Sequence, residues 1–288
     1  MPAPTTARTR TAQAHPQLPG FTPAPARPVT ATAWNLPDPA ARRQVVDTYL
    51  AGGYAIVHVP GAAPTEADLT ALADALNLAA AFTPPQYRGS AHTQGAVSRL
   101  SATDDPAHPF QDRAGQNFHS DGTLQHLGQI ATTVMMCVRG ARTGGDTLLF
   151  NAVQAFADLQ DADPDAAAQL THDRALLRTS TLVENLSTAG PVFGHDPAGQ
   201  WISRYSLTVT DSYHPTAPGR RAHLERALAH LADAAQPGSP YYCAFTLAAG
   251  QALVLANDRL SHGRTAFTDD ADAPRLLLRG LYTARPTA

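Results

Sequence analysis

The stretch Phe118-His119-Ser120-Asp121-Gly122 places an imidazole and a carboxylate two positions apart. On a β-strand, the side chains at positions i and i+2 leave the same face. His119 and Asp121 can therefore converge on one ion, as two of the three ligands of a 2-His-1-carboxylate triad. Such a triad holds non-haem Fe(II) and leaves coordination positions open. The fold then has to bring a second histidine to this pair.

His262 is the candidate for that second histidine. It lies in Ser261-His262-Gly263-Arg264, shortly after the apolar run 252–256, which is typical of a buried strand. The two histidine-containing stretches are far apart in the sequence. A β-sandwich or barrel with long-range strand pairing suits such a site better than a helical bundle.

The composition excludes several classes of partner and chemistry. The chain has 288 residues and a formal net charge of −3, so it carries no basic footprint for nucleic acid or an anionic membrane surface. No apolar run approaches the ~20 residues of a membrane-spanning helix. Its basic residues are all arginine, which excludes a Schiff-base lysine and a Walker A lysine. We expect a small-molecule substrate, and the sequence does not indicate an oligomeric state.

The two cysteines, Cys137 and Cys243, are too few for a disulfide framework or a cysteine metal site. The N-terminus lacks the apolar stretch of a secretory signal. Both features favour a reducing compartment, and we expect a cytoplasmic location.

Periodicity and turn residues predict a mainly β fold with helical buttresses. We expect a disordered tail over 1–30 and a single domain over 31–288. The segment 80–115 is rich in Pro, Gly, Ser, Thr and Asp and leads directly into the His119 stretch, which favours an active-site border or lid. A helical insert is expected over 208–240. The expected strands are 54–59, 129–138, 146–151, 175–181, 191–194, 200–207, 242–247, 251–256 and 275–282, and the expected helices are 40–50, one beginning at 64–68, 152–159, 164–170 and 220–234.

Four groups of residues, taken together and in order, resemble the TauD/TfdA superfamily of Fe(II)/2-oxoglutarate-dependent oxygenases. The groups are Asn117–Thr123, Gly144–Leu148, Ser261–Phe267 and Arg275–Arg279. The His262-Gly263-Arg264 form of the distal motif is closer to the clavaminate-synthase and γ-butyrobetaine-hydroxylase branches than to taurine dioxygenase. Many members carry Asp-Asn-Arg shortly before the distal histidine, and this chain keeps only the asparagine, Asn257.

The resemblance implies a double-stranded β-helix, or jelly roll, similar to the cupins. It implies Fe(II) as the metal, held by His119, Asp121 and His262, with 2-oxoglutarate and O2 as cosubstrates. Thr147 and Arg275 would hold the far carboxylate of 2-oxoglutarate, because a planar guanidinium suits bidentate capture of a carboxylate. Arg279 would contact the C1 carboxylate of the cosubstrate or the substrate itself. An aspartate, instead of a small residue, at position 121 favours hydroxylation over halogenation.

The sequence says less about the substrate. We expect an amino acid or a related small metabolite, oxidised at an unactivated C–H bond by hydroxylation, desaturation or cyclisation as 2-oxoglutarate is decarboxylated to succinate and CO2. In amino-acid hydroxylases of this branch, an acidic residue after an Arg-Tyr strand holds a cationic group, and Asp211 stands in a similar place here. The candidate substrate residues are Gln116, Asn117, Leu186, Phe193, Arg204 and Asp211.

Two other functions remain open at this point. A zinc hydrolase also uses His and Asp ligands, although it has no use for the Thr147 and Arg275 pair. A jelly-roll binding protein without catalysis is the other alternative, although such a protein has no need of an intact triad.

Overall fold

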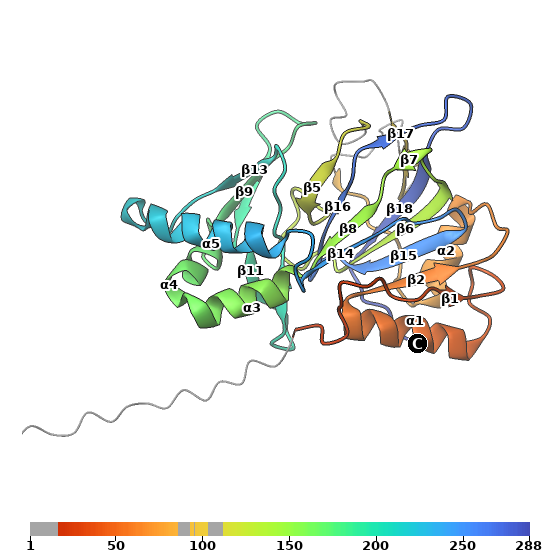
Figure 1. Ribbon diagram of the computed structural model, residues 1–288, viewed down its shortest axis with the longest axis horizontal. Coiled ribbons are helices and arrows are strands. Elements are labelled where there is room, and N and C mark those ends of the chain that lie inside the picture. Colours follow the sequence, from red (N-terminus) through yellow and green to blue (C-terminus); the bar gives the residue numbers. More distant parts are fainter. Residues whose placement is uncertain (1–16, 86–92, 95, 103–111) are drawn as a thin grey trace, which may run out of the picture.

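The computed structural model of the chain describes residues 17–85, 93–94, 96–102 and 112–288. Two β-sheets form its centre (Figure 1). The larger sheet has the order β1-β2-β15-β6-β18-β4-β3, and the smaller has the order β14-β8-β16-β5. The strands of the larger sheet are β1 (Val29–Thr30), β2 (Tyr54–His58), β15 (Gln251–Ala256), β6 (Thr132–Arg139), β18 (Leu276–Tyr282), β4 (Val97–Leu100) and β3 (Thr93–Gln94); those of the smaller are β14 (Tyr242–Phe245), β8 (Thr147–Phe150), β16 (Ser261–Arg264) and β5 (Gln116–His119).

The two sheets enclose a layer of buried apolar side chains. Met135 of β6 and Leu253 of β15 come from the larger sheet, and Leu149 of β8 and Cys243 of β14 from the smaller. Alternation along each strand sends every second side chain into this layer. The mainly β, jelly-roll-like arrangement expected from the sequence is therefore present.

Two helices cover the outer face of the larger sheet (Figure 1). Helix α1 (Pro39–Gly52) begins with Asp38 as its N-cap and ends at Gly53, whose φ of 78° suits glycine. Helix α2 (Glu66–Ala75) begins with a capping box between Thr65 and Asp68. Both helices pack their apolar faces against strands of the larger sheet and so bury its outer face.

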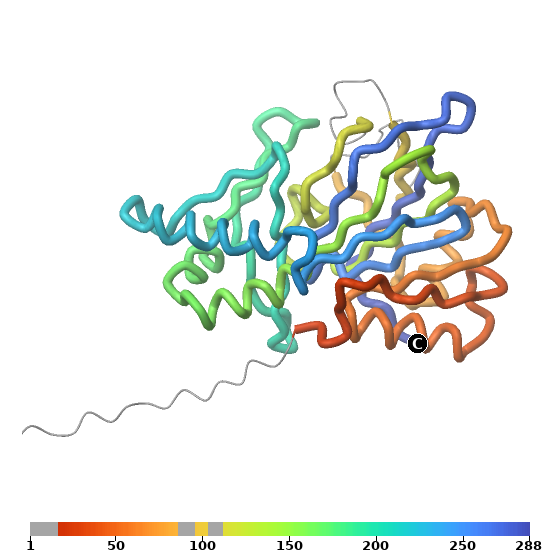
Figure 2. Tube along the Cα trace, viewed as in Figure 1, coloured from red at the N-terminus to blue at the C-terminus, as the bar shows by residue number. Residues whose placement is uncertain are grey.

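A helical lobe lies on the other side, next to the smaller sheet (Figure 2). It contains α3 (Ala152–Ala162), α4 (Pro164–Ala167) and α5 (Arg221–Ala234), which share one apolar cluster with Phe150 of β8. The expected insert 208–240 lies here and includes α5. Short strands and turns complete the fold: β9 (Leu176–Thr179), β10 (Ser187–Gly190) and β13 (Asp211–Tyr213); β11 (Phe193–His195) and β12 (Trp201–Ser203); β7 (Thr143–Gly144) and β17 (Phe267–Thr268); η2 (Ala168–Leu170) and η3 (Pro218–Arg220).

The prediction of a disordered tail over 1–30 is wrong from residue 17 onward. Leu18 is buried, the backbone N–H of Gly20 donates to the carbonyl of Ala51, and β1 pairs in parallel with β2. Isolated apolar side chains anchor this segment without any periodic pattern, so a search for periodicity misses it. Residues 1–16 lie outside the described part of the chain.

The segment 80–115 is only partly described. The expectation of a lid falls largely on 86–92, 95 and 103–111, which lie outside the described residues. Where the structure describes it, the segment contributes β4, which pairs with β18 inside the larger sheet. This part is sheet rather than lid.

Among the residues that the structure describes, none of the helices has the length and hydropathy of a membrane-spanning segment.

We predict that Leu72→Ala lowers the free energy of unfolding by about 2–5 kcal/mol, because Leu72 is fully buried between α2 and the larger sheet. Leu50→Ala is the matched control. Leu50 lies on α1 with 54% of its surface exposed, and its substitution should change stability by less than about 0.5 kcal/mol. Urea unfolding measures both, and equal losses would contradict this account of the core.

Candidate active site

The two histidines of the expected triad face each other across a strand pair. His119 is the last residue of β5, and His262 on β16 is its direct partner in the antiparallel register. Asp121 lies two residues beyond the end of β5, in a bend followed by Gly122 with a φ of 94°. The expectation that His119 and Asp121 share a strand face is therefore wrong in its geometry, because the chain turns after His119. The turn nevertheless delivers the carboxylate to the same place.

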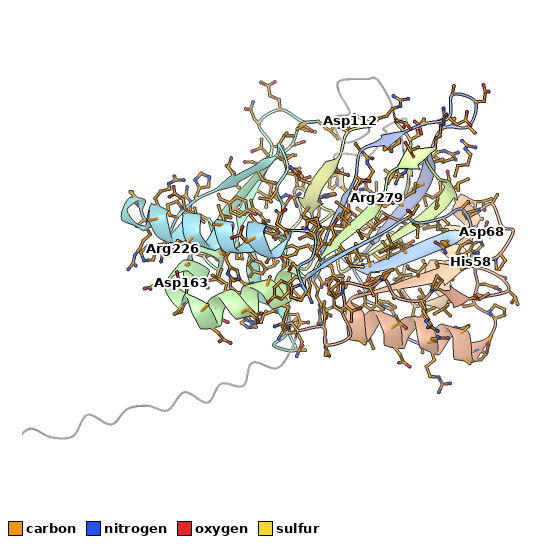
Figure 3. The ribbon with its side chains drawn as sticks, viewed as in Figure 1. His58, Asp68, Asp112, Asp163, Arg226 and Arg279 are labelled. Atoms are coloured by element: carbon orange, nitrogen blue, oxygen red, sulfur yellow. The ribbon has the colours of Figure 1, made fainter. Side chains whose placement is uncertain are left out.

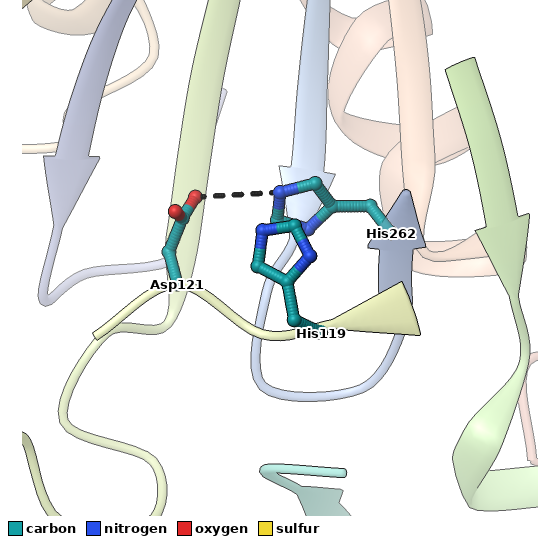
Figure 4. A group of neighbouring side chains, drawn as sticks. All are labelled: His119, Asp121 and His262. Carbon is teal, nitrogen blue, oxygen red and sulfur yellow. Dashed lines mark ion pairs between the residues drawn. The ribbon is translucent and has the colours of Figure 1, made fainter. Parts of the chain in front are cut away.

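The three side chains have the geometry of a metal site (Figure 4). One ligand atom from each of His119, Asp121 and His262 lies within 4.8 Å of the others. Nε2 of His262 is 3.7 Å from Oδ2 of Asp121, and the two imidazole rings have centroids 4.2 Å apart. Two imidazoles and one carboxylate are the donor set of a facial triad. The residues present therefore fit Fe(II).

Both histidines are held in the neutral form that a metal requires. Burial lowers the pKa of His119, and burial together with the neighbouring His119 lowers the pKa of His262 to about 3. Nδ1 of His119 is 2.9 Å from the backbone carbonyl of Asn117. A neutral His119 that donates this hydrogen bond has Nε2 free as the ligand atom.

The carboxylate of Asp121 is stabilised in its ionised form. Burial favours the protonated acid, but the Arg279 guanidinium outweighs it and lowers the pKa of Asp121. Nη1 of Arg279 donates to Oδ1 at 2.6 Å, and the Thr133 hydroxyl donates to Oδ2 at 2.8 Å. Arg279 was expected to contact the cosubstrate or substrate. In this structure it pairs with the metal-ligating carboxylate, near the centre of the molecule (Figure 3).

Asn257 holds the backbone of Asp121. Its Oδ1 accepts from the Asp121 N–H at 2.7 Å, and its Nδ2 donates to the carbonyls of Asp121 and Ile130 at 3.2 and 2.9 Å. Asn257 is 2% exposed, so water does not compete for these bonds. The one residue kept from the family's Asp-Asn-Arg pattern therefore positions a metal ligand.

Thr147 and Arg275, the expected 2-oxoglutarate residues, are both buried. Thr147 on β8 pairs with Arg264, two residues beyond His262 on β16. Gly144 and Gly145, with φ of 68° and 75°, turn the chain into β8. A Cβ on Gly145 would lie 3.3 Å from Nε of Arg275, so glycine gives this guanidinium its space.

The guanidinium of Arg275 makes no hydrogen bond or ion pair to any described residue; only its backbone N–H donates, to Asp269. Its Cζ lies 5.2 Å from the Phe267 ring centroid, and burial followed by repulsion from Arg264 lowers its pKa to about 10. A buried cation without a partner attracts an anion. Arg275 is thus free to bind a carboxylate.

Gln116 and Asn117, expected to contact substrate, line an open groove at the far end of β5. The groove is also lined by Asp112, Gly115, Leu207, Thr208, Val209 and Arg264. Nη2 of Arg264 donates to the carbonyls of Asp112 and Ala114, at 2.9 and 2.7 Å. Its Nη1 has no hydrogen bond to the described part of the chain. Nη2 also lies 3.6 Å from Oδ1 of Asp112, so the groove offers an ion pair and two carboxamides.

The other expected substrate residues do not line this groove. Phe193 is fully buried and stacks on Phe156, with ring centroids 4.0 Å apart. Arg204 is buried and donates to the carbonyls of residues 125, 176 and 188. Asp211 forms an ion pair with Arg178 at 3.1 Å, with its side chain only 2% exposed. Leu186 is 41% exposed on the helical lobe. Nothing in the sequence indicated how deeply these four residues are buried. The helical lobe encloses Phe193, Arg204 and the Asp211 side chain.

Sequence reasoning missed Thr133 and Arg178. Thr133 stands in an apolar strand, and Arg178 in a strand of the lobe, with no motif around either. Thr133 donates to Asp121, and Arg178 donates to the backbone carbonyls on either side of Asp121. Of the residues that contact Asp121, Asn257 and Arg279 carried a signal in the sequence.

We predict that Asn257→Ala lowers the Fe(II) affinity of the apo-protein by about ten- to a hundredfold, as expected when a residue that orients a metal ligand is lost. Asn35→Ala, at an exposed position, is the matched control and should leave the affinity unchanged. Anaerobic Fe(II) titration measures both. Wild-type affinity in a folded Asn257→Ala variant would contradict the positioning role.

Comparison with known proteins agrees with this site. The family model described as "Taurine catabolism dioxygenase TauD, TfdA family" matches residues 18–282. A uridine-5'-phosphate dioxygenase from an Amycolatopsis species is 41% identical over 87% of this chain and 92% of its own length. A second protein of that name, from a Streptomyces species, is 34% identical over 84% and 89%.

A solved structure shares the fold. An asparagine oxygenase in complex with Fe(II), 2S,3S-3-hydroxyasparagine and succinate superposes with a TM-score of 0.60 at 16% identity, covering 85% of this chain and 84% of that one. The jelly-roll expectation is thereby confirmed. The family match, together with the triad, also confirms the expected class of enzyme, an Fe(II)- and 2-oxoglutarate-dependent oxygenase, over the hydrolase and binding-protein alternatives. The chain belongs to the TauD, TfdA family of dioxygenases.

Proposed function

We propose that this enzyme oxidises uridine 5'-phosphate or a closely related nucleoside 5'-phosphate. The similarity to two uridine-5'-phosphate dioxygenases, at 41% and 34% identity over most of the chain, carries the proposal. It replaces the amino-acid substrate expected from the sequence. That expectation relied on Asp211 as a free acid for a cationic group, and Asp211 is already paired with Arg178. A cytoplasmic location and a small-molecule partner are part of the proposal.

His119, Asp121 and His262 hold Fe(II) in this proposal, and Thr147 and Arg275 hold 2-oxoglutarate. The bound iron supplies the oxidation of an unactivated C–H bond, with O2 consumed and 2-oxoglutarate converted to succinate and CO2. The chain keeps both imidazoles neutral and the carboxylate ionised. Arg275 supports cosubstrate binding because its buried guanidinium has no hydrogen bond or ion pair to the residues that the structure describes, and a dicarboxylate complements it.

We infer that the nucleotide lies in the groove beside β5. Arg264 stands two residues from His262 on β16, which at the usual strand rise is roughly 7 Å along the strand. A phosphate at Arg264 would therefore keep the adjoining sugar within reach of the iron. The carboxamides of Gln116 and Asn117 supply both donors and acceptors, which match the edge of a uracil ring.

The cosubstrate assignment predicts a spectroscopic result. Addition of 2-oxoglutarate to the anaerobic Fe(II) protein should produce the weak visible metal-to-ligand charge-transfer band of the chelate. His119→Ala should abolish the band. Arg275→Gln should weaken 2-oxoglutarate binding by roughly tenfold or more while Fe(II) still binds, because a charged hydrogen-bond partner is lost.

Arg99→Gln is the control for that experiment. Arg99 pairs with Glu66 at the exposed surface, and its loss should leave the band unchanged. A wild-type protein that binds Fe(II) but never develops the band would contradict the use of 2-oxoglutarate.

The substrate assignment predicts that uridine 5'-phosphate stimulates 2-oxoglutarate-dependent succinate formation, whereas uridine, which lacks the phosphate, and free amino acids do not. Arg264→Gln should raise the KM for the nucleotide by roughly tenfold, since its guanidinium is the proposed phosphate partner. The KM for 2-oxoglutarate, measured in the same variant, separates this effect from a disturbance of the neighbouring Arg275. Equal stimulation by uridine and its 5'-phosphate would overturn the phosphate contact.

A further inference from the structure

A buried ion pair in the helical lobe reaches the loop that carries Asp121. Arg178 on β9 and Asp211 on β13 are direct cross-strand partners. Nε of Arg178 donates to Oδ1 of Asp211 at 3.1 Å, and the two side chains are only 3% and 2% exposed. This pair lies far outside the triad in sequence, and no expected role accounts for it.

Nη1 of Arg178 points at the loop that carries Asp121. It donates to the carbonyls of Ser120 and Gly122, both at 3.2 Å. These two carbonyls belong to the residues on either side of Asp121. A planar guanidinium with a fixed fork of donors suits this task, because it holds the carbonyls in one orientation. The peptide units around the metal carboxylate are thus fixed from the lobe side by Arg178 and from the sheet side by Asn257.

Asp211 fixes the position of Arg178 and is itself fully engaged. Its Oδ2 accepts from the Ser206 hydroxyl at 2.7 Å and from the backbone N–H of Thr208 at 2.6 Å. The Thr210 hydroxyl donates to Oδ1 at 2.8 Å. Asp211 therefore holds Arg178 and the 206–210 segment in a single arrangement.

The same contacts reach the groove. Thr208, whose hydroxyl also donates to Asp211 at 2.9 Å, lines the groove, and Asn117 of β5 donates to the carbonyl of Leu207 at 3.1 Å. Asp211 therefore contacts Thr208 in the groove directly and the loop that carries Asp121 through Arg178.

We propose that Arg178 and Asp211 are positioning residues for Asp121, which set the metal affinity of the site by fixing the backbone on both sides of the carboxylate. The pair acts through the protein and touches neither metal nor substrate. The proposal concerns the metal site alone and does not depend on the identity of the substrate.

The test uses the full-length apo-protein and Co(II) alone, as an oxygen-stable probe of the Fe(II) site. Arg178→Lys keeps the positive charge beside Asp211 but loses the fork of donors. We expect a Co(II) affinity about tenfold or more below wild type, within the range for residues that orient metal ligands. The increase in thermal midpoint that Co(II) gives the wild type should shrink accordingly.

Arg204→Lys is the control matched for burial. Arg204 is a second buried arginine of the lobe that donates to backbone carbonyls, none of which flanks a triad residue. Both substitutions should destabilise the fold, but only Arg178→Lys should lower the Co(II) affinity. Arg226→Lys, in the exposed pair with Asp163, should change neither property (Figure 3). Equal Co(II) affinities in the two buried variants would overturn the proposal.

A milder pair of variants covers the case in which Arg178→Lys does not fold. Ser206→Ala keeps both charges and removes the hydroxyl between Nη2 of Arg178 and Oδ2 of Asp211. We expect Co(II) to bind about threefold more weakly. Ser203→Ala, which removes another buried hydroxyl of the lobe, should leave the affinity unchanged. A wild-type affinity in Ser206→Ala would contradict the proposal.

Discussion

Asp121 is a carboxylate that must stay ionised while it is buried beside two neutral imidazoles, and the site is built around this requirement. Water cannot solvate it, so the protein has to supply the compensating groups. Asp121 follows β5 of the smaller sheet, whereas its donors Arg279 and Thr133 come from β18 and β6 of the larger sheet. The carboxylate is therefore stabilised only when the two sheets are packed together.

Charge compensation also distinguishes the buried arginines from one another. Arg178 pairs with Asp211, and Arg279 pairs with Asp121. Arg204 satisfies its terminal donors with carbonyls. Arg275 alone among these four has a guanidinium without a hydrogen bond to the described residues. A buried cation with no partner among the described residues attracts an anion, and this supports the proposal that Arg275 holds the cosubstrate.

The sequence carried most of the site and the type of fold. The triad was predictable because its three residues stand in family motifs, and the structure brings them together. Thr147 and Arg275 come from the same motifs, and their role with 2-oxoglutarate stays a prediction. The strands 251–256 and 275–282 were predictable because their apolar runs are long. Strand β16 was not, since Ser261-His262-Gly263-Arg264 has no alternating pattern and is held as a strand by its neighbours β5 and β8.

The residues that orient the ligands were harder to find for the same physical reason. Thr133 and Arg178 contact Asp121 or its neighbours from other strands, and nothing local in the sequence distinguishes them from an ordinary strand threonine or arginine. The turn after His119 was missed for a related reason. An alternation rule assumes that the strand continues, whereas here the chain leaves the strand at His119 and still brings the Asp121 carboxylate to the two histidines.

Asp211 shows that a place in a family pattern does not establish that a charge is free to bind substrate. An acid in this position can hold a cationic substrate only if its charge is free. Here Arg178 supplies the cation from within the chain, and hydroxyl and backbone donors occupy both oxygens of the carboxylate. The place that would select a cationic amino acid has become part of the support for the loop that carries Asp121. The groove instead presents Arg264, whose ion pair with Asp112 and hydrogen bonds to carbonyls all involve Nη2 among the described residues, and its Nη1 suits a substrate that carries a negative group, such as a phosphate.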